Sequence, residues 1–324
     1  LPAFVPPAMS MLSQINETWQ SLVELVIRPP RHEYDVKELG ETRSAIIICF
    51  YMFITLWSRL IVSGSLVVRE DFELINSRGL VIKGSHFQPA ECDAESEHVA
   101  ENIRPRKDPF PCVVYCHGNA GSRVDALTLL PMLLPEGVSL CCFDFSGAGH
   151  SEGKFLSLGF YEREDIRTVV DFLTSGNRVS RIGLWGHSMG ASSCLLYSSE
   201  TPHEQVCALV LDSPFSSLEA VISEVAASGK QQLIDSGLTG VRLVPNLLIP
   251  VAVAAIRRSI LAQAGFDTRE VAPLTRCGAA FIPAVFGHGE HDDMIAPYHS
   301  QRLHEAYAGN TSLYRFPGSH NSPR

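Results

Sequence analysis

A serine between two glycines stands where a predicted strand meets a predicted helix. Ser188 is the centre of Gly-His-Ser-Met-Gly. Residues 181–185 before it are typical of a short buried strand, and residues 191–197 after it are typical of a helix. In a sharp strand–turn–helix, the glycines keep strand and helix from colliding, and the serine hydroxyl is exposed at the tip. We therefore predict that Ser188 is a nucleophile.

A serine hydroxyl is a weak nucleophile near neutral pH, so it needs a histidine that accepts its proton and an acid that orients this histidine. In a parallel sheet, such groups lie on loops at the carboxyl ends of the strands. His320 follows the last predicted strand, 312–316, and we predict that it is the base. His187 is expected to point away from the serine and to pack, and His150 is expected to be structural.

The acid is expected after the predicted strand 281–286, where Gly-His-Gly-Glu-His-Asp-Asp offers three carboxylates. We choose Asp292, and Asp293 is the alternative, because the sequence does not separate adjacent carboxylates. Asp212, after the preceding strand, is a further alternative. An aspartate before Ser-Pro is more often a turn residue, and we favour that interpretation for Asp212.

An oxyanion hole needs two backbone N–H groups that point at the developing negative oxygen. The first is predicted to come from Met189, directly after the nucleophile. The second is predicted to come from Asn119, in the loop His-Gly-Asn-Ala-Gly that follows the predicted strand 112–116. The glycines of that loop let the backbone approach a substrate closely.

The elements that must position these residues alternate between strand and helix from residue 111 onward. Such alternation predicts an α/β fold, with a mostly parallel sheet and helices on both faces. Residues 66–87 predict an antiparallel hairpin at a sheet edge, and residues 89–109 predict a loop. After Asp212 the alternation of strands and helices ends. A largely helical stretch at about 218–270, interrupted by prolines, predicts a cap over the sheet.

Residues 1–65 form a separate N-terminal region. Apolar residues recur on one face of a predicted helix over 11–27, which we expect to dock on the main domain; an interfacial membrane helix is the alternative. The apolar run 45–62 is interrupted by Arg59, so a buried helix or insertion is favoured over a membrane anchor. Residues 11–62 remain the expected place of any peripheral membrane contact.

Composition excludes several classes of function. The chain has 324 residues and a formal charge of −9, which offers no basic surface for nucleic acid. Its nine cysteines show no paired metal-ligand spacing, so neither a metal site nor a cofactor is expected. Free thiols fit a reducing compartment. We therefore expect a cytoplasmic protein, with membrane association as the alternative.

The order of these motifs resembles the α/β-hydrolase superfamily and, within it, the serine aminopeptidase-like branch, including plant and protist members. The likeness covers residues 20–40 and 66–324. It implies an α/β-hydrolase domain over 66–324 in which Ser188, Asp292 and His320 are nucleophile, acid and base. Members of the branch continue into a final helix, so a C-terminal helix is expected to be missing here.

The expected function is a serine hydrolase that cleaves an ester, thioester or amide bond of a small-molecule or acylated substrate through an acyl-enzyme. Esterase, thioesterase, lipase and serine aminopeptidase-like activities are all compatible with these motifs. Two alternatives stay open: a non-catalytic binding protein on a hydrolase fold, and a membrane-associated protein acyl thioesterase.

Overall fold

The computed structural model describes residues 17, 19–21, 23–24, 26–40, 66–92, 103–235 and 249–323. Within these described residues, nine strands form the sheet. Eight of them follow the order β1-β2-β5-β4-β6-β7-β8-β9, while β3 pairs with β2. The strands are β1 (Val67–Ile75), β2 (Val81–Cys92), β3 (Ile103–Pro105), β4 (Phe110–Cys116), β5 (Ser139–Phe143), β6 (Val179–His187), β7 (Val206–Asp212), β8 (Ala284–Gly289) and β9 (Thr311–Phe316). All neighbours from β5 to β9 pair in parallel. The predicted mostly parallel sheet is confirmed.

The edge of the sheet is the antiparallel hairpin of β1 and β2. β2 also pairs antiparallel with β5 and with the short β3. The predicted loop over 89–109 was therefore wrong at residues 89–92, which extend β2, and at residues 103–105, which form β3. Residues 106–109 are a loop as predicted. The alternation of residue types at 89–92 is too short to be separated from a loop by its pattern alone.

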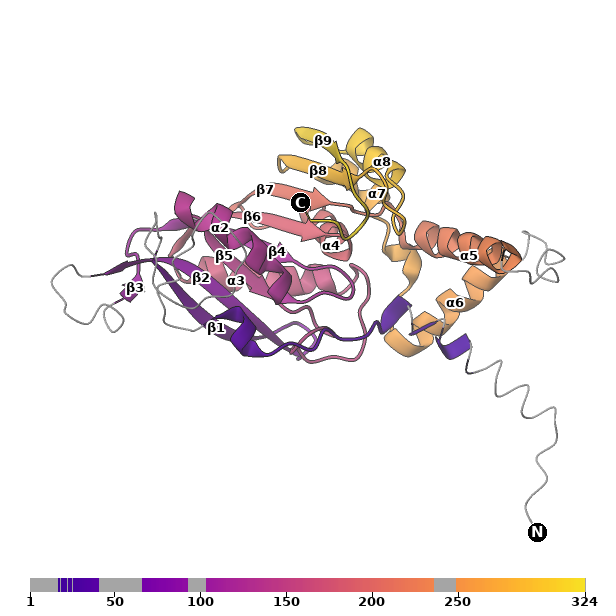
Figure 1. Cartoon of the computed structure of the whole chain (residues 1–324), viewed down its shortest axis with the longest axis horizontal. Helices are drawn as coiled ribbons and strands as arrows, with labels where there is room; N and C mark the ends of the chain where they lie inside the picture. The colour runs from indigo at the N-terminus through magenta and orange to yellow at the C-terminus, as the bar shows by residue number, and fades with distance from the viewer. Residues whose placement is uncertain are drawn as a thin grey trace, which may run out of the picture.

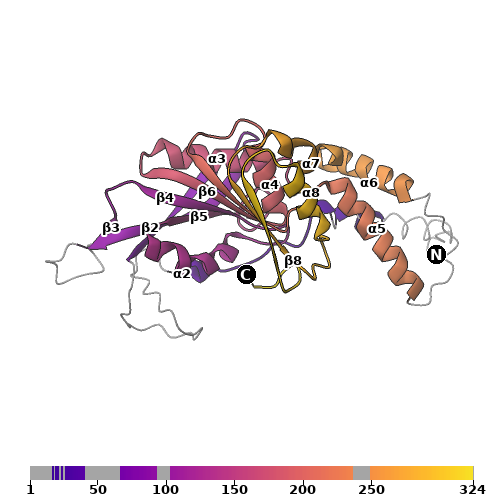
Figure 2. The ribbon, with the colours of Figure 1, turned by 90° about the horizontal axis from the view of Figure 1, so that it is seen from above.

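Helices cover both faces of the sheet, as Figure 2 shows. They are α2 (Leu130–Leu133), α3 (Glu162–Ser175), α4 (Met189–Ser198), α5 (Leu218–Asp235), α6 (Ile249–Ala264), α7 (Pro273–Arg276) and α8 (Tyr298–Ala306). The larger core cluster packs α3, α4 and α8 against one face, and the smaller cluster packs α2 and its flanking 3₁₀ helices against the other. Both faces are thus covered over the middle of the sheet, whereas Val285 of β8 and Tyr314 of β9 are exposed.

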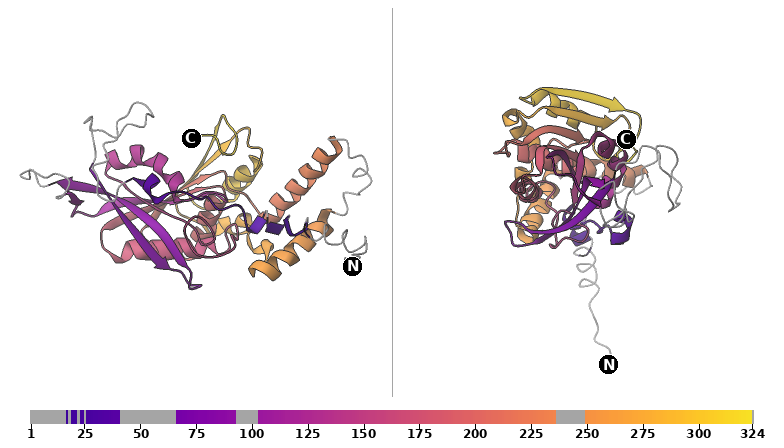
Figure 3. Two further views of the ribbon diagram at one scale, coloured as in Figure 1. Left: turned by 60° about the horizontal axis from the view of Figure 1, so that its bottom comes forward. Right: turned by 90° about the vertical axis from the view of Figure 1, so that its left-hand side faces the viewer.

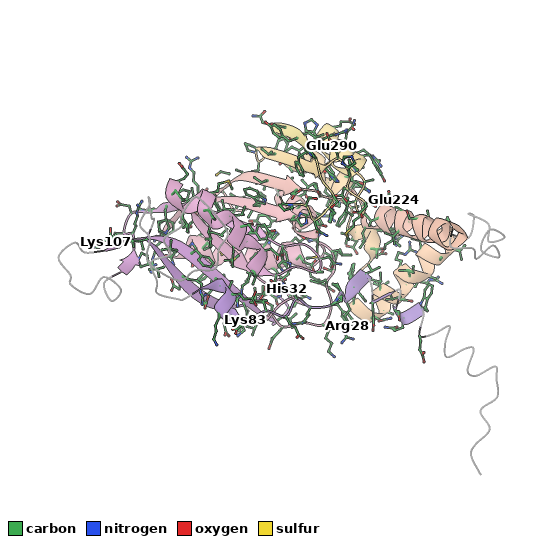
Figure 4. All side chains as sticks on the ribbon, in the orientation of Figure 1. Arg28, His32, Lys83, Lys107, Glu224 and Glu290 are labelled. Carbon is green, nitrogen blue, oxygen red and sulfur yellow. The ribbon has the colours of Figure 1, made fainter. Side chains whose placement is uncertain are left out.

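Two cap helices, α5 and α6, extend away from the end of the sheet (Figure 1). Leu218 and Ile222 of α5 and Val253 of α6 are buried in the main core, so the base of the cap is part of the main body of the fold. Glu224 of α5, labelled in Figure 4, accepts hydrogen bonds from Tyr298 Oη and, at 3.0 Å, from His299 Nε2 of α8. The loop between the helices lies outside the described residues.

The N-terminal segment is helical at its described positions between 17 and 27. Val23 and Ile27 are fully buried in the main core, and Trp19 Nε1 donates to Ser259 Oγ of α6 at 3.0 Å. The helix therefore docks on the body beside the cap. Residues 28–40 then run back across the molecule toward β1 (Figure 3).

Residues 41–65, including the apolar run 45–62, lie outside the described residues, as do residues 1–16. Among the helices that the structure does describe, none combines the length and apolar character needed to cross a bilayer. Membrane contact through residues 11–62 stays a prediction.

Gly190 is expected to be indispensable for folding. A Cβ atom there would lie 1.9 Å from the carbonyl oxygen of Cys116, and this backbone atom cannot move aside. Gly190→Ala should lower the free energy of unfolding by about 3 kcal/mol or more, measured by urea denaturation. Gly176→Ala is the matched control, because its Cβ meets nothing within 4 Å and its φ of −88° suits alanine. Equal stability of the two variants would contradict this account of the turn.

Candidate active site

The turn between β6 and α4 holds Ser188 at φ 52°, ψ −115°, a backbone conformation that L-residues rarely adopt. Gly186 and Gly190 permit this turn: a Cβ at Gly186 would lie 2.4 Å from the amide nitrogen of Ala191. The Ser188 N–H donates to the carbonyl oxygen of Asp212 at 2.7 Å, which ties the turn to β7. The hydroxyl is half-buried and therefore open to a ligand.

The loop after β9 brings His320 to the serine. His320 Nε2 lies 2.9 Å from Ser188 Oγ, and His320 Nδ1 lies 2.6 Å from Asp292 Oδ2. The loops carrying the two partners are tied together, since the N–H of His291 donates to the carbonyl of Gly318 at 3.0 Å. The structure thus joins the predicted serine, histidine and first-choice aspartate in one hydrogen-bonded row.

Asp292 is 9% exposed and held by several donors. Its Oδ1 accepts from the N–H groups of Met294 at 3.0 Å and Ile295 at 2.8 Å. Its Oδ2 also lies 3.1 Å from His288 Nε2. Burial alone raises the pKa of the Asp292 carboxyl, but the hydrogen bonds from His288, His320 and Ile295 N–H hold it well below its usual range. Asp292 is therefore ionised near neutral pH and favours Nδ1–H on His320.

His288 supports this arrangement and was not singled out from the sequence. Its Nε2 also contacts the Ile295 carbonyl at 2.8 Å, and its Nδ1 lies 2.6 Å from Ser300 Oγ. Two acceptors around Nε2 require the proton there, so His288 donates to Asp292. The alternative acid, Asp293, is exposed and has no contact with this row.

The loop after β4 lies beside the nucleophile. A Cβ at Gly118 would stand 3.7 Å from Ser188 Cβ, so the backbone of this loop approaches the serine closely. His117, which is fully buried, holds the loop: its Nδ1 donates to the Gly118 carbonyl at 2.7 Å, and its Nε2 accepts from the Phe145 N–H at 3.0 Å. Burial lowers the pKa of His117, which keeps the ring neutral. Met189 begins α4, where backbone N–H groups have no partner within the helix.

A second histidine–carboxylate pair borders the site. His187 Nδ1 lies 3.1 Å from Asp212 Oδ2, and the His187 ring centroid lies 5.1 Å from that of His320. His187 was predicted to point away from the serine and to pack. Its half-buried ring does pack against Gly118, but it also lies beside the ring of His320. The register of β6 against β7 could have revealed this pair, because His187 and Asp212 are partners at the carboxyl ends of these strands.

Comparison with known proteins finds a family model and several relatives that match parts of the chain. Residues 107–250 match the family model described as "Serine aminopeptidase, S33". The chain is 28% identical to the Bacillus subtilis protein YqkD over 76% of this chain and 73% of that protein. It is 27% identical to the lysophosphatidylserine lipase ABHD12 of Xenopus tropicalis over 63% of this chain, but spans only 48% of that lipase.

Solved structures share the architecture at lower identity. The Pyrococcus furiosus esterase Pf2001 matches with a TM-score of 0.55 and 20% identity, over 79% of this chain and 85% of that structure. An acetyl xylan esterase from Paenibacillus sp. R4 matches with a TM-score of 0.57 and 16% identity, over 96% of this chain and 89% of that structure. At these identities the likeness concerns the fold.

Asp292 should stabilise the fold in a pH-dependent way. Because its pKa is depressed in the folded state, its stabilisation is present above the unfolded value of about 4 and is lost as the pH falls below it. Asp292→Asn should lower the free energy of unfolding at pH 7 by about 1–3 kcal/mol, and the difference from wild type should shrink between about pH 5 and 3. Denaturant titrations at each pH measure this difference. The exposed Asp293→Asn is the control, and an equal effect of both variants would refute the assignment of Asp292.

Proposed function

We propose that this chain, which belongs to the α/β-hydrolase superfamily, is a serine hydrolase that cleaves an ester, thioester or amide bond through an acyl-enzyme. The observation that carries the proposal is the row Ser188–His320–Asp292, with contacts of 2.9 and 2.6 Å. A serine activated by a histidine that is oriented by an ionised carboxylate is the arrangement that acyl transfer requires.

In the proposed reaction, Ser188 Oγ attacks the substrate carbonyl carbon while its proton passes to His320 Nε2. Asp292 holds the resulting imidazolium without taking the proton. When the tetrahedral intermediate collapses, the bond to the leaving group breaks and His320 donates the proton to that group. A water molecule, deprotonated by His320, then attacks the acyl-enzyme and releases the acid with Ser188 restored.

The backbone N–H groups of Asn119 and Met189 are proposed as the oxyanion hole. The support is geometric: Gly118, next to Asn119, lies against Ser188, and Met189 follows Ser188 at the start of α4. Both amides belong to backbone that is fixed before substrate arrives, which is what makes such donors effective.

An acyl ester is the proposed substrate class. The cap places apolar residues of α5 and α6 at the carboxyl-end side of the sheet, which suits a hydrocarbon chain better than a polar one. The names of two relatives point the same way, one being a lysophosphatidylserine lipase and one an esterase. Thioester and peptide bonds share the same carbonyl chemistry and belong in the same screen.

Ser188→Ala should abolish labelling by a fluorophosphonate probe and lower hydrolysis of acyl esters by at least about 10³-fold, since no other nucleophile replaces the hydroxyl. Gel fluorescence and p-nitrophenyl ester turnover measure the two effects. Ser199→Ala at the end of α4 is the control and should label normally. Retained turnover in Ser188→Ala would disprove the nucleophile. A folded wild-type chain that neither labels nor turns over would instead support the binding-protein alternative.

Acyl-chain selection should respond to a bulkier cap. Val253→Phe places a larger side chain at a buried position of α6, whereas Val251→Phe changes an exposed position two residues away. We expect Val253→Phe to disfavour long over short acyl esters by about 10-fold in kcat/KM. A ring too large for this packed position displaces neighbouring cap side chains into the space that we propose for a long chain. Steady-state kinetics with esters of graded length test this. If the two variants and the wild type had the same dependence of kcat/KM on acyl-chain length, the proposal that the cap forms part of the acyl site would be disproved.

A further inference from the structure

The segment after the N-terminal helix, residues 28–40, crosses the molecule as an extended strap that ends in the 3₁₀ helix Val36–Leu39. Arg28 and His32, labelled in Figure 4, mark its course from the side of α6 toward β1. Arg31 donates from Nη1 to the carbonyls of Gly149 and Ser151 at 3.0 and 2.8 Å. The strap is therefore bonded to the loop that follows β5.

The loop 117–123, which carries the proposed oxyanion donor, is fastened at both ends to the residues that follow β5. At its start, His117 Nε2 accepts from the Phe145 N–H at 3.0 Å. At its end, the Arg123 N–H donates to Asp144 Oδ1 at 2.8 Å. Adjacent residues 144 and 145 thus set both ends of the loop, and any shift of Asp144 would shift the loop's exit.

Asp144 is fully buried, and the strap supplies one of its donors. Tyr34 Oη donates to Asp144 Oδ2 at 2.6 Å and accepts from Arg123 Nε at 2.6 Å. The Tyr34 hydroxyl therefore links the buried carboxylate of Asp144 to the buried guanidinium of Arg123. The Nε atom of Arg123 also lies 3.7 Å from Asp144 Oδ2. Burial, with the Asp144 charge adding to it, raises the pKa of Tyr34 far above its usual value, so the hydroxyl keeps the proton it donates.

Two further contacts fix the strap to the same place. The rings of Tyr34 and His150 stack with centroids 4.2 Å apart and planes 6° from parallel. His32 Nδ1 lies 2.8 Å from the hydroxyl of Ser122, the residue that caps the helix after the oxyanion loop. The strap thus contacts the exit of the loop directly at Ser122 and indirectly through Asp144.

We propose that Tyr34 is a positioning residue of catalysis, which acts through Asp144 and Arg123 to hold the Asn119 N–H where the oxyanion forms. This inference rests on the proposed function. The strap then belongs to the catalytic apparatus although it contacts neither Ser188 nor His320. Its contribution falls on the transition state rather than on substrate binding, because an oxyanion donor acts most strongly on the charged intermediate.

The test compares Tyr34→Phe with Tyr307→Phe. Tyr34 and Tyr307 are both buried, with 7% and 8% of their surface exposed. The Tyr34 hydroxyl donates to Asp144 at 2.6 Å, and the Tyr307 hydroxyl donates to the Ile282 carbonyl at 2.5 Å, away from the site. Each substitution therefore removes one buried hydrogen-bond donor. We expect Tyr34→Phe to lower kcat about 10-fold with KM within about twofold of wild type, and to raise Ki for a trifluoromethyl ketone by the same factor. Tyr307→Phe should lower Tm and leave kcat and Ki unchanged.

His32→Ala provides a second variant if Tyr34→Phe does not fold, because His32 is half-buried and less tightly held. We expect it to lower kcat about threefold, with the same increase in Ki and an unchanged KM. The inference would be overturned if the folded strap variants kept the kcat and Ki of wild type, or if only their KM changed. The proposed hydrolase would still stand in that case, provided that the wild type showed Ser188-dependent labelling. A folded wild type without labelling would overturn both.

Discussion

The site depends on one close approach between backbones. Gly190 lies so near the Cys116 carbonyl that a single added carbon would stand 1.9 Å from the oxygen. This contact sets the first turn of α4 against the end of β4, and it brings the serine and the loop after β4 to the same point. The positive φ of Ser188 follows from it, because the chain must reverse within one residue between strand and helix. The Asp212 carbonyl holds the reversed backbone through the Ser188 N–H.

Two buried carboxylates, one on each side of the serine, maintain the geometry. Asp292 collects donors from His288, His320 and two backbone amides, and Asp144 collects donors from Tyr34, Arg123 and the His150 N–H. A buried charge is tolerable only where hydrogen bonds replace its hydration. Each carboxylate therefore fixes its neighbours, which rigidifies His320 on one side and the loop after β4 on the other.

The features that depend on a local pattern of residues could be predicted from the sequence. The strand–turn–helix around Ser188 and the alternation after residue 111 are visible because each is encoded by adjacent residues. Asp292 was preferred to Asp293 from the sequence, but the physical distinction between them lies in the loop conformation, which buries one carboxylate and exposes its neighbour. The pair of His187 and Asp212 needed the register of β6 against β7, and the role of Tyr34 needed the path of a strap whose partners are about a hundred positions away. Contacts of that range leave no periodicity in the sequence.

The hydrogen bond between Ser188 and His320 joins residues 132 positions apart, and the strap adds contacts that span 110 positions. Closing such long stretches of chain costs entropy before any local contact compensates for it, so we expect these links to form late in folding. A partly folded chain can have a complete sheet and core while the Ser188 hydroxyl still lacks its contact with His320 and is not activated. If Ser188 is the nucleophile that we propose, its chemical reactivity reports the arrival of the last native contacts. It would then distinguish the finished molecule from compact intermediates that spectroscopy of secondary structure does not separate.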